Sequence, residues 1–102
     1  MYRKILIANR GEIAVRLIRA CHNLGISSVA VYQAVDASSL HVRLADESCQ
    51  LDSALGFNDV QALLTLAQRS GADTIHCGIG FLAENAEFAY ACQRQGIAFI
   101  GP

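Results

Sequence analysis

The residues best suited to contact a ligand lie in a glycine-containing segment near the C-terminal end of the chain. The segment reads His76-Cys77-Gly78-Ile79-Gly80-Phe81-Leu82-Ala83-Glu84-Asn85. Because glycine has no Cβ, the backbone N–H groups around Gly78 and Gly80 can approach a ligand closely. The helical pattern that follows adds unpaired N–H donors and a partial positive charge at its N-terminus. The segment predicts either a ligand-binding loop or a loop that uses glycine only to turn.

A second polar turn, Asn9-Arg10-Gly11-Glu12, separates an apolar run from another helical pattern. Glu12 suits the first turn of that helix because its charge complements the helix dipole. Its spacing to Arg16 predicts an i, i+4 ion pair that contributes about 0.2–0.5 kcal/mol. Arg16 and Arg19 share the polar face of this helix, which is either a solvated surface or a contact surface.

The chain has four cysteines and three histidines, and two pairs are adjacent in sequence, Cys21 with His22 and His76 with Cys77. Adjacent side chains point in different directions on a helix or a strand, so neither pair converges on one metal ion. No C-x-x-C spacing occurs. The cysteines are therefore predicted to be buried, reduced thiols, and no metal site is expected.

Length and composition limit the classes of function. The 102 residues suffice for one domain with one core. A hydrophobic fraction of 53% favours a sheet covered by helices or a surface buried by a partner. A net charge of −1, without a basic block, argues against binding to nucleic acid. Apolar runs such as Ile5–Ala8 are too short to span a membrane, and no signal or transit pattern occurs, so we expect a cytoplasmic protein.

Strand and helix patterns alternate along the whole chain. Apolar runs predict strands at 4–8, 28–32, 49–51, 74–76 and 97–100, and helical periodicity predicts helices at 12–23, 59–69 and 83–95, with a short turn at 40–45. Because parallel neighbours need a crossover, this order predicts an α/β fold, a Rossmann-like open parallel sheet of about five strands with helices on both faces. The crevice of such a sheet lies at the carboxyl ends of the strands, where the strand order reverses. We expect the turn at 9–12 and the segment at 78–85 to flank that crevice.

The apolar positions within the helices predict which faces are buried. The expected inward residues of the first helix are Ile13, Leu17, Ala20, Cys21 and Leu24, with Gly25 as the terminating glycine. The expected inward residues of the second helix are Val60, Leu63, Leu64 and Ala67, with Asn58 or Asp59 as the N-cap.

A complete dinucleotide-binding domain is a weaker interpretation of the same pattern. Its first turn would read G-x-G-x-x-G, whereas residues 8–13 contain a single glycine. Glu12 would repel a pyrophosphate at that turn. Asp36 follows the second strand and is placed to reach a ribose, but one acidic residue there is little evidence.

Five strings along the chain resemble one family, the N-terminal domain of biotin carboxylase. They are Ile5–Arg16, Ser28–Tyr32, His41–Glu47, the string G-x-G-F-L-x-E-N-A at 78–86, and Phe99–Pro102. The match runs through the whole chain in order, and the strings I-A-N-R-G-E-I-A and G-x-G-F-L-x-E-N are highly specific to this family. Biotin carboxylase is the ATP-dependent component of acetyl-CoA, propionyl-CoA, methylcrotonyl-CoA, pyruvate and urea carboxylases.

The resemblance implies a pre-ATP-grasp domain over residues 1–102, which in the family precedes an ATP-grasp domain and a C-terminal domain. In the family, ATP phosphorylates bicarbonate, and carboxyphosphate then carboxylates biotin on a carrier protein. The lysines, glutamates and arginines that bind MgATP, bicarbonate and biotin in the family belong to the later domains. This chain alone is therefore expected to bind no cofactor and to be inactive. The partners implied are the remaining domains, the biotin carboxyl carrier protein and a second copy of the chain.

The same resemblance implies roles for particular residues. Gly78, Ile79 and Gly80 correspond to the glycine loop that lines the bicarbonate and biotin pocket. Glu84 and Asn85 correspond to residues that fix this loop at the start of the helix. Arg16 and Arg19 correspond to the dimer contact surface, and none of the 102 residues is assigned a catalytic role.

The glycine segment departs from the family pattern, H-P-G-Y-G-F-L-S-E-N, at three positions. Ile79 in place of Tyr removes a hydroxyl and an aromatic wall, and Cys77 in place of Pro removes a restraint on φ. Ala83 in place of Ser removes an N-cap oxygen, which typically contributes about 1 kcal/mol. These departures motivate an alternative function, a stand-alone, non-catalytic homologue that binds a partner carboxylase or a small anion through the two loops.

Overall fold

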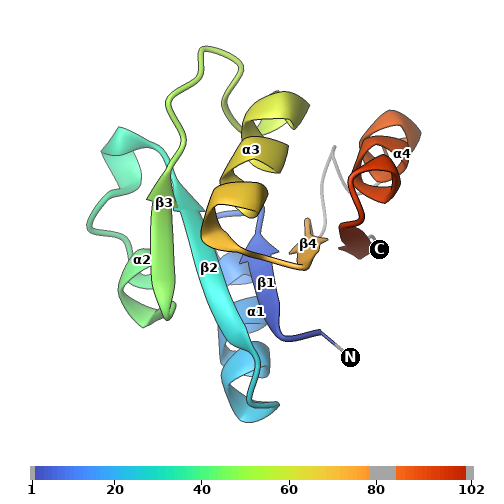
Figure 1. Cartoon of the computed structure of the whole chain (residues 1–102). Coiled ribbons are helices and arrows are strands. Elements are labelled where there is room, and N and C mark those ends of the chain that lie inside the picture. The colour runs from blue at the N-terminus through green and yellow to red at the C-terminus, as the bar shows by residue number, and fades with distance from the viewer. Residues whose placement is uncertain (1, 79–84, 101–102) are drawn as a thin grey trace.

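The computed structural model describes residues 2–78 and 85–100, in which strands and helices alternate (Figure 1). The strands are β1 (Lys4–Ile7), β2 (Ser27–Tyr32), β3 (Glu47–Gln50), β4 (Thr74–His76) and β5 (Ala98–Ile100). The helices are α1 (Gly11–Asn23), α2 (Leu40–Leu44), α3 (Val60–Ser70) and α4 (Ala86–Arg94), with 3-10 turns η1 (Ala34–Asp36) and η2 (Gly56–Asn58). In this described part of the chain, no helix is both long enough and apolar enough to cross a bilayer.

The five strands form one parallel sheet in the order β3-β2-β1-β4-β5. The chain moves outward from β1 through β2 to β3 and then returns to the other side of β1 for β4 and β5. The strand order therefore reverses between β1 and β4, as the sequence predicts. Ile7 pairs with His76, so these two strands reach the carboxyl edge at the same level.

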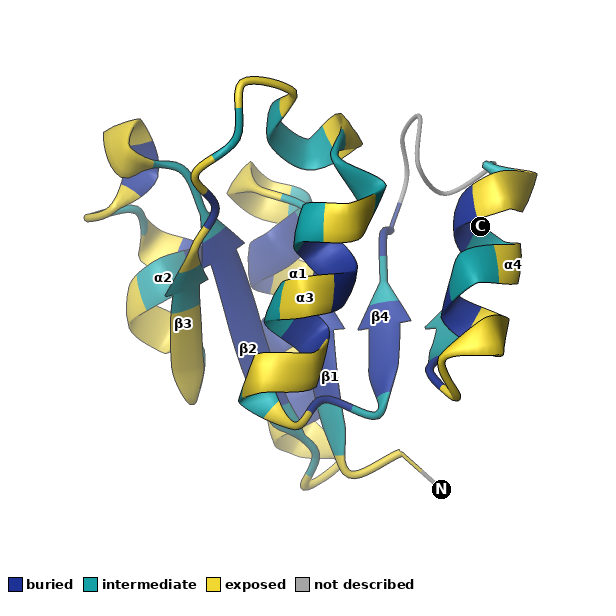
Figure 2. Cartoon of the chain, turned by 45° about the horizontal axis from the view of Figure 1, so that its top comes forward, coloured by how far each residue is buried: buried dark blue, intermediate teal, exposed yellow. Residues whose placement is uncertain are grey.

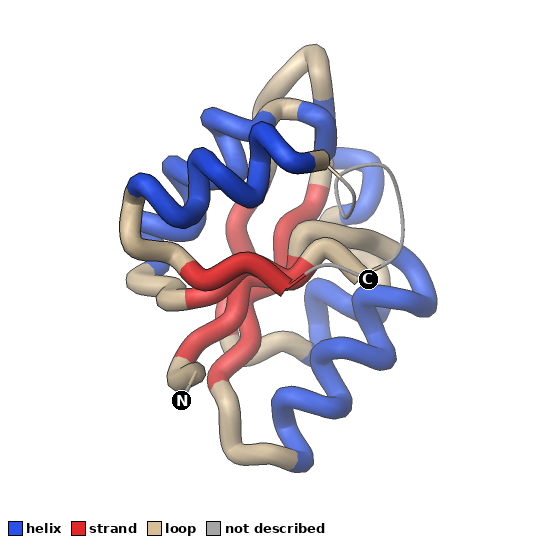
Figure 3. Tube along the Cα trace, turned by 90° about the vertical axis from the view of Figure 1, so that its right-hand side faces the viewer, coloured by secondary structure: helices blue, strands red, loops and turns tan. Residues whose placement is uncertain are grey.

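Helices cover both faces of the sheet, which confirms the predicted fold class (Figures 1 and 3). On one face, α1 packs against the central strands through a buried cluster made up of Ile5, Ile7, Ala14, Ile18, Cys21 and Ala30. On the other face, α3 and α4 contribute Leu63, Leu64, Ala67, Phe88 and Cys92 to a larger cluster. Figure 2 shows the buried residues gathered in the central strands and on the sides of the helices that face them.

The central strands carry apolar side chains on both faces because helices cover both sides of the sheet. Leu6, Ile7, Val29, Val31 and Ile75 are fully buried. Burial of each side chain of this size contributes about 1.5–3 kcal/mol, so these strands hold the carboxyl edge in place. The edge strand β3 is largely exposed and polar, which disfavours pairing with another sheet.

The buried face of α1 differs from the predicted one. Ala14, Val15, Ile18 and Cys21 are buried, whereas Leu24 is 74% exposed. Ile13 and Leu17 are half-buried because they lie beside the turn at Gly78, at the margin of the core. Gly25 follows the helix with φ +72°, as expected for a terminating glycine.

The boundaries of the other elements agree with the sequence or shift by a few residues. The strand β3 begins at Glu47 instead of Cys49, because its pairing with β2 extends to Val29 opposite Glu47. Asp59 is the N-cap of α3, and the predicted inward residues Leu63, Leu64 and Ala67 are buried. The helix α4 begins at Ala86, so its N-cap is Asn85 rather than residue 83.

Candidate functional site

The turn between β1 and α1 lies at the carboxyl edge and is held by Asn9. The Nδ2 group of Asn9 donates a hydrogen bond of 2.7 Å to the carbonyl of Cys77, which follows β4. Its Oδ1 accepts a hydrogen bond of 2.7 Å from the backbone N–H of Arg10. The turn at 9–12 is therefore hydrogen-bonded to Cys77, the residue directly before the predicted segment at 78–85.

Gly78 continues the chain beyond β4 in a conformation that suits glycine. Its φ is +65°, and the residue is buried. A Cβ at this position would lie 2.7 Å from Ile13 Cγ2 and 3.2 Å from Asn9 Nδ2. Glycine is therefore required here both by the left-handed backbone and by the close approach of α1.

His76 makes a further contact within this turn. Its Nδ1 accepts a hydrogen bond of 3.0 Å from the backbone N–H of Gly78. Burial lowers the pKa of His76 below its ordinary value of 6.5. An imidazole that accepts at Nδ1 carries its proton on Nε2, so the geometry and the burial both favour the neutral ring.

The structure describes two of the five residues predicted to line the substrate pocket. Gly78 lies at the junction of the two turns, and Asn85 begins α4, where its Oδ1 accepts a hydrogen bond of 3.2 Å from Phe88 N. Ile79, Gly80 and Glu84 fall outside the described residues. Because the side chain of Asn85 caps the helix, the expectation that Ala83 costs the helix its N-cap is wrong.

An ion pair that the sequence did not indicate joins the turn after β1 to η1, which follows β2. Arg10 Nη2 lies 2.6 Å from Asp36 Oδ1. The side chain of Asp36 is only 10% exposed, whereas that of Arg10 is 58% exposed. Asp36 Oδ1 is therefore engaged at the carboxyl edge by a cation, whereas its buried Oδ2 has no hydrogen-bond partner in the described part of the chain. The only signal in the sequence was that Asp36 follows β2, which places it near the carboxyl edge of the sheet.

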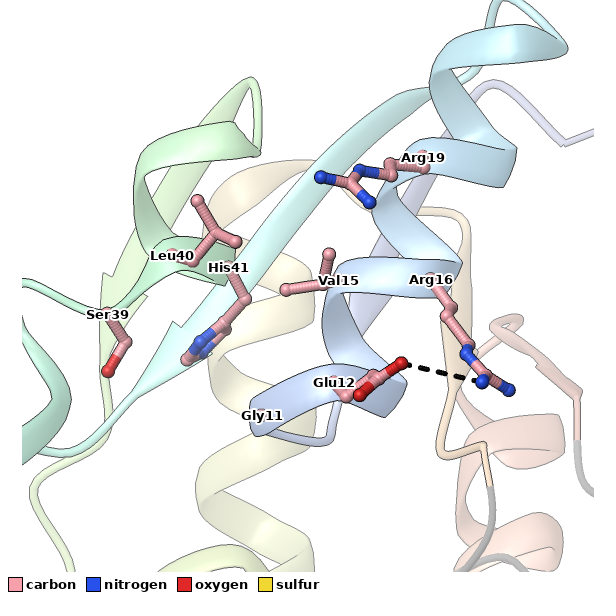
Figure 4. A pocket seen from close by; sticks show the side chains of 8 residues that line it. All are labelled: Gly11, Glu12, Val15, Arg16, Arg19, Ser39, Leu40 and His41. Carbon is pink, nitrogen blue, oxygen red and sulfur yellow. Dashed lines mark ion pairs between the residues drawn. The ribbon is translucent and has the colours of Figure 1, made fainter.

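A pocket of about 480 Å³ opens between α1 and α2 and includes both predicted interface residues (Figure 4). In this view Arg19 extends toward α2, whereas Arg16 turns toward Glu12. The Arg16–Glu12 ion pair, at 3.4 Å, confirms the predicted i, i+4 pair. A second pocket of about 280 Å³ continues along the same two helices past Arg19 to Leu44. Arg16 and Arg19 therefore lie in a groove between α1 and α2 and not on an even surface.

The residues that α2 and its N-cap contribute to this groove were not predicted from the sequence. Ser39, Leu40 and His41 line its wall. His41 is buried, and its Nε2 lies 3.1 Å from the carbonyl of Val31. His41 begins the string His41–Glu47, which resembles the family, but no pattern in the sequence indicated where His41 lies in the fold.

The cysteines are all free, and three of the four are buried. Burial raises the pKa of Cys77 to about 12 and that of Cys92 to about 11. Cys49 is half-buried. Among residues 2–78 and 85–100, no group of three or more His, Cys, Asp or Glu residues is placed to hold a metal ion. Because burial raises their pKa values, the buried thiols are protonated and poorly reactive at neutral pH.

The sheet order and the contact between the two turns place the chain in the class of Rossmann-like open α/β proteins. A Rossmann-like parallel sheet has its first strand at the centre, and two turns meet at its carboxyl edge, where the strand order reverses. Open α/β sheets of this class bind ligands at that edge.

The chain belongs to the family described as biotin carboxylase, N-terminal domain, which it matches over residues 1–102. It is 50% identical to the biotin carboxylase of Halalkalibacterium halodurans over 105 residues, covering 100% of this chain and 23% of that protein. It is also 50% identical over 102 residues to the mitochondrial methylcrotonoyl-CoA carboxylase subunit alpha of Dictyostelium discoideum, covering 97% of this chain and 15% of that protein. The chain thus spans less than a quarter of these relatives.

Solved structures agree with this assignment. The biotin carboxylase domain of a single-chain bacterial carboxylase is 52% identical, with a TM-score of 0.92 over 95% of this chain and 23% of that one. The biotin carboxylase domain of Hydrogenobacter thermophilus 2-oxoglutarate carboxylase, a dimer in complex with MgADP, ADP and bicarbonate, is 47% identical with a TM-score of 0.92, covering 100% of this chain and 23% of that one. Similarity to domains of larger carboxylases along the whole chain does not favour the alternative of a non-catalytic binding module.

Proposed function

We propose that this chain forms one wall of the active-site cleft of an ATP-dependent biotin carboxylase. In this proposal Gly78, Ile79 and Gly80 line the pocket for bicarbonate and biotin, and Glu84 and Asn85 fix the segment at the start of α4. The observation that carries the proposal is the hydrogen bond from Asn9 to the Cys77 carbonyl, because it joins both turns at the ligand-binding edge of the sheet. The bicarbonate and MgADP in the Hydrogenobacter thermophilus relative support the choice of substrates.

The chemistry proposed for the whole enzyme has two steps. An oxygen of bicarbonate attacks the γ-phosphorus of ATP, the bond to the bridging oxygen breaks, and ADP leaves. The carboxyphosphate then transfers its carboxyl group to N1′ of biotin and releases phosphate. Phosphoryl transfer requires cations around the transferred group. Because this chain has a net charge of −1, we assign that role to the remaining domains and expect no turnover from these 102 residues alone.

The groove between α1 and α2 is the proposed contact surface with a second copy of the chain. Arg16 and Arg19 supply charge, and Leu40 and Leu44 are each more than 40% exposed along the same groove. Exposed apolar side chains beside cations are typical of surfaces that a partner buries. The dimer of the Hydrogenobacter thermophilus relative supports this proposal.

Other partners follow from the same function. The relatives are domains of larger carboxylases, so we propose that the remaining domains cover the carboxyl edge. A biotin carboxyl carrier protein would present biotin to the cleft. The four free cysteines are consistent with a reducing compartment, and we propose the cytoplasm.

The function is tested on the natural full-length protein that carries this domain. ADP formation that depends on both biotin and bicarbonate, with transfer of labelled bicarbonate carbon to biotin, is the expected result. Ile79→Tyr restores the residue usual in the family and should lower KM for biotin, whereas Ala83→Ser serves as a matched control in the same segment. A full-length protein that cleaves ATP without any dependence on biotin or bicarbonate would refute the proposed function.

The interface is tested separately by sedimentation of the full-length protein. Arg19→Glu reverses a charge inside the groove and should shift a dimer toward monomer. Arg69→Glu makes the same change on an exposed position of α3 and should leave the sedimentation unchanged. Equal behaviour of the two variants would contradict the interface.

A further inference from the structure

His76 is placed to control the direction in which the chain leaves β4. It is the last residue of that strand, and its Nδ1 accepts the backbone N–H of Gly78 at 3.0 Å. The carbonyl of the intervening Cys77 accepts from Asn9 at 2.7 Å. The turn is thus fixed by one side chain from within β4 and by another from the facing turn.

The strand neighbours of His76 are apolar. The residues in register on the adjacent strands are Ile7 on β1 and Ile100 on β5. Ile7 belongs to the cluster under α1, so His76 faces the same side of the sheet. On α1, the residues beside Gly78 are Ile13 and Leu17.

The helix on this side of the sheet, α1, presents its charged side chains to solvent. The charged residues of α1, Glu12, Arg16 and Arg19, are exposed on the surface of that helix. Within residues 2–78 and 85–100, His76 takes part in no ion pair. No carboxylate in that part of the chain therefore compensates a charge on the imidazole.

Protonation has a defined effect on this contact. A neutral imidazole offers a lone pair at Nδ1, whereas an imidazolium carries a hydrogen there and can only donate. The Gly78 N–H would then face another donor, and the hydrogen bond would be lost. Burial lowers the pKa of His76 below 6.5, so the contact is intact at neutral pH and is lost only as the pH falls through this lowered pKa.

We propose that His76 is a positioning residue for Gly78: its neutral imidazole holds the Gly78 amide, and protonation releases that amide. The consequence for catalysis rests on the proposed function, since Gly78 is the first residue of the proposed pocket wall. The contact itself does not depend on that function. It is a pH-sensitive restraint on the turn that follows β4.

The test measures the contact directly in the intact protein labelled with ¹⁵N-glycine and ¹⁵N-histidine. At pH 7.5 we expect a scalar coupling across the hydrogen bond between Gly78 N and His76 Nδ1, with the proton of the ring on Nε2. We also expect the coupling to disappear on acidification. The protection of the Gly78 amide against hydrogen exchange should fall at the same time, after correction for the intrinsic pH dependence of exchange. We expect a fall of about fivefold, which corresponds to the loss of one ordinary hydrogen bond.

Two variants separate positioning from a general structural role. His76→Asn keeps an acceptor at the δ position but cannot titrate, so Gly78 should stay protected at both pH values. His76→Leu has a similar shape without an acceptor, so protection should be lost at both. Wild-type protection that is independent of pH, or that equals the protection in His76→Leu, would overturn the proposal. Because exchange requires no substrate, failure of the proposed function would leave this result unchanged.

Discussion

The carboxamide of Asn9 donates a hydrogen bond of 2.7 Å to the carbonyl of Cys77, 68 residues later in the chain. This bond crosses the line where the strand order reverses, between β1 and β4. The positions of the two turns at the carboxyl edge are therefore coupled, and any ligand bound by one turn meets the other in a fixed arrangement.

Removal of the Asn9 donor should destabilise the domain. Asn9→Leu keeps a similar shape but leaves the Cys77 carbonyl without its partner, which should lower the free energy of unfolding by about 1–3 kcal/mol. Asn9→Asp should cost more, since it places a carboxylate against the carbonyl. Urea unfolding provides the measurement. Asn23→Leu, at the exposed last residue of α1, should change stability by no more than about 0.5 kcal/mol.

A side chain at Gly78 should be tolerated less well than one at another left-handed glycine. Gly78→Ala combines the backbone cost of φ +65° with a contact of 2.7 Å to Ile13, and overpacking of this kind costs about 1–3 kcal/mol. Gly71→Ala has φ +76° and no atom within 4 Å of the new Cβ, so it isolates the backbone cost of about 1–2 kcal/mol. Thermal or urea unfolding should rank Gly78→Ala as clearly the less stable variant. Equal losses would show that α1 moves aside.

The ion pair between Arg10 and Asp36 should be coupled in a double-mutant cycle. Arg10→Ala leaves the buried Asp36 carboxylate without its cation and should cost about 1–3 kcal/mol, reduced from the value for a fully buried pair because Arg10 is half exposed. Adding Asp36→Asn to this variant should recover part of the loss. Strict additivity of the two single changes in urea unfolding would argue that the pair contributes nothing.

The four cysteines should differ in their reactivity toward an alkylating reagent at pH 8. Burial raises the pKa of Cys77 to about 12 and of Cys92 to about 11, and Cys21 is also buried with a raised pKa. Cys49 is half-buried on the edge strand and should be modified first, although burial raises its pKa as well. Peptide mapping by mass spectrometry identifies the order. As a control, all four cysteines should react at similar rates once the domain is unfolded in concentrated urea.

The order of the elements and the meeting of the two turns were predictable from the sequence. Apolar runs such as Leu6–Ile7 and Val29–Val31 predict strands covered on both faces, and only parallel pairing accommodates their alternation with helices. Parallel topology then places Asn9 and Gly78 at one edge before any contact is known.

Contacts that depend on side-chain direction were not predictable. Asp36 pairs with Arg10 because the segment after β2 turns back over the carboxyl edge, and no local pattern encodes that path. The predicted inward face of α1 is rotated by about one residue from the observed one. It included Leu24, which is apolar but lies beyond the last turn of α1 that packs on the sheet. His41 became part of a groove wall only through the placement of α2 against α1.

The central position of β1 has a consequence for synthesis of the protein. This strand is made first, yet one of its two neighbours, β4, is made about 70 residues later. A ribosome must therefore extend the nascent chain beyond His76 before Leu6 and Ile7 gain their second strand neighbour. Until then one flank of an apolar strand stays open, and long-range parallel pairing of this kind is slow and prone to aggregation. Slower translation after β4 should thus favour the folded product, whereas a pause before residue 74 should favour capture by chaperones.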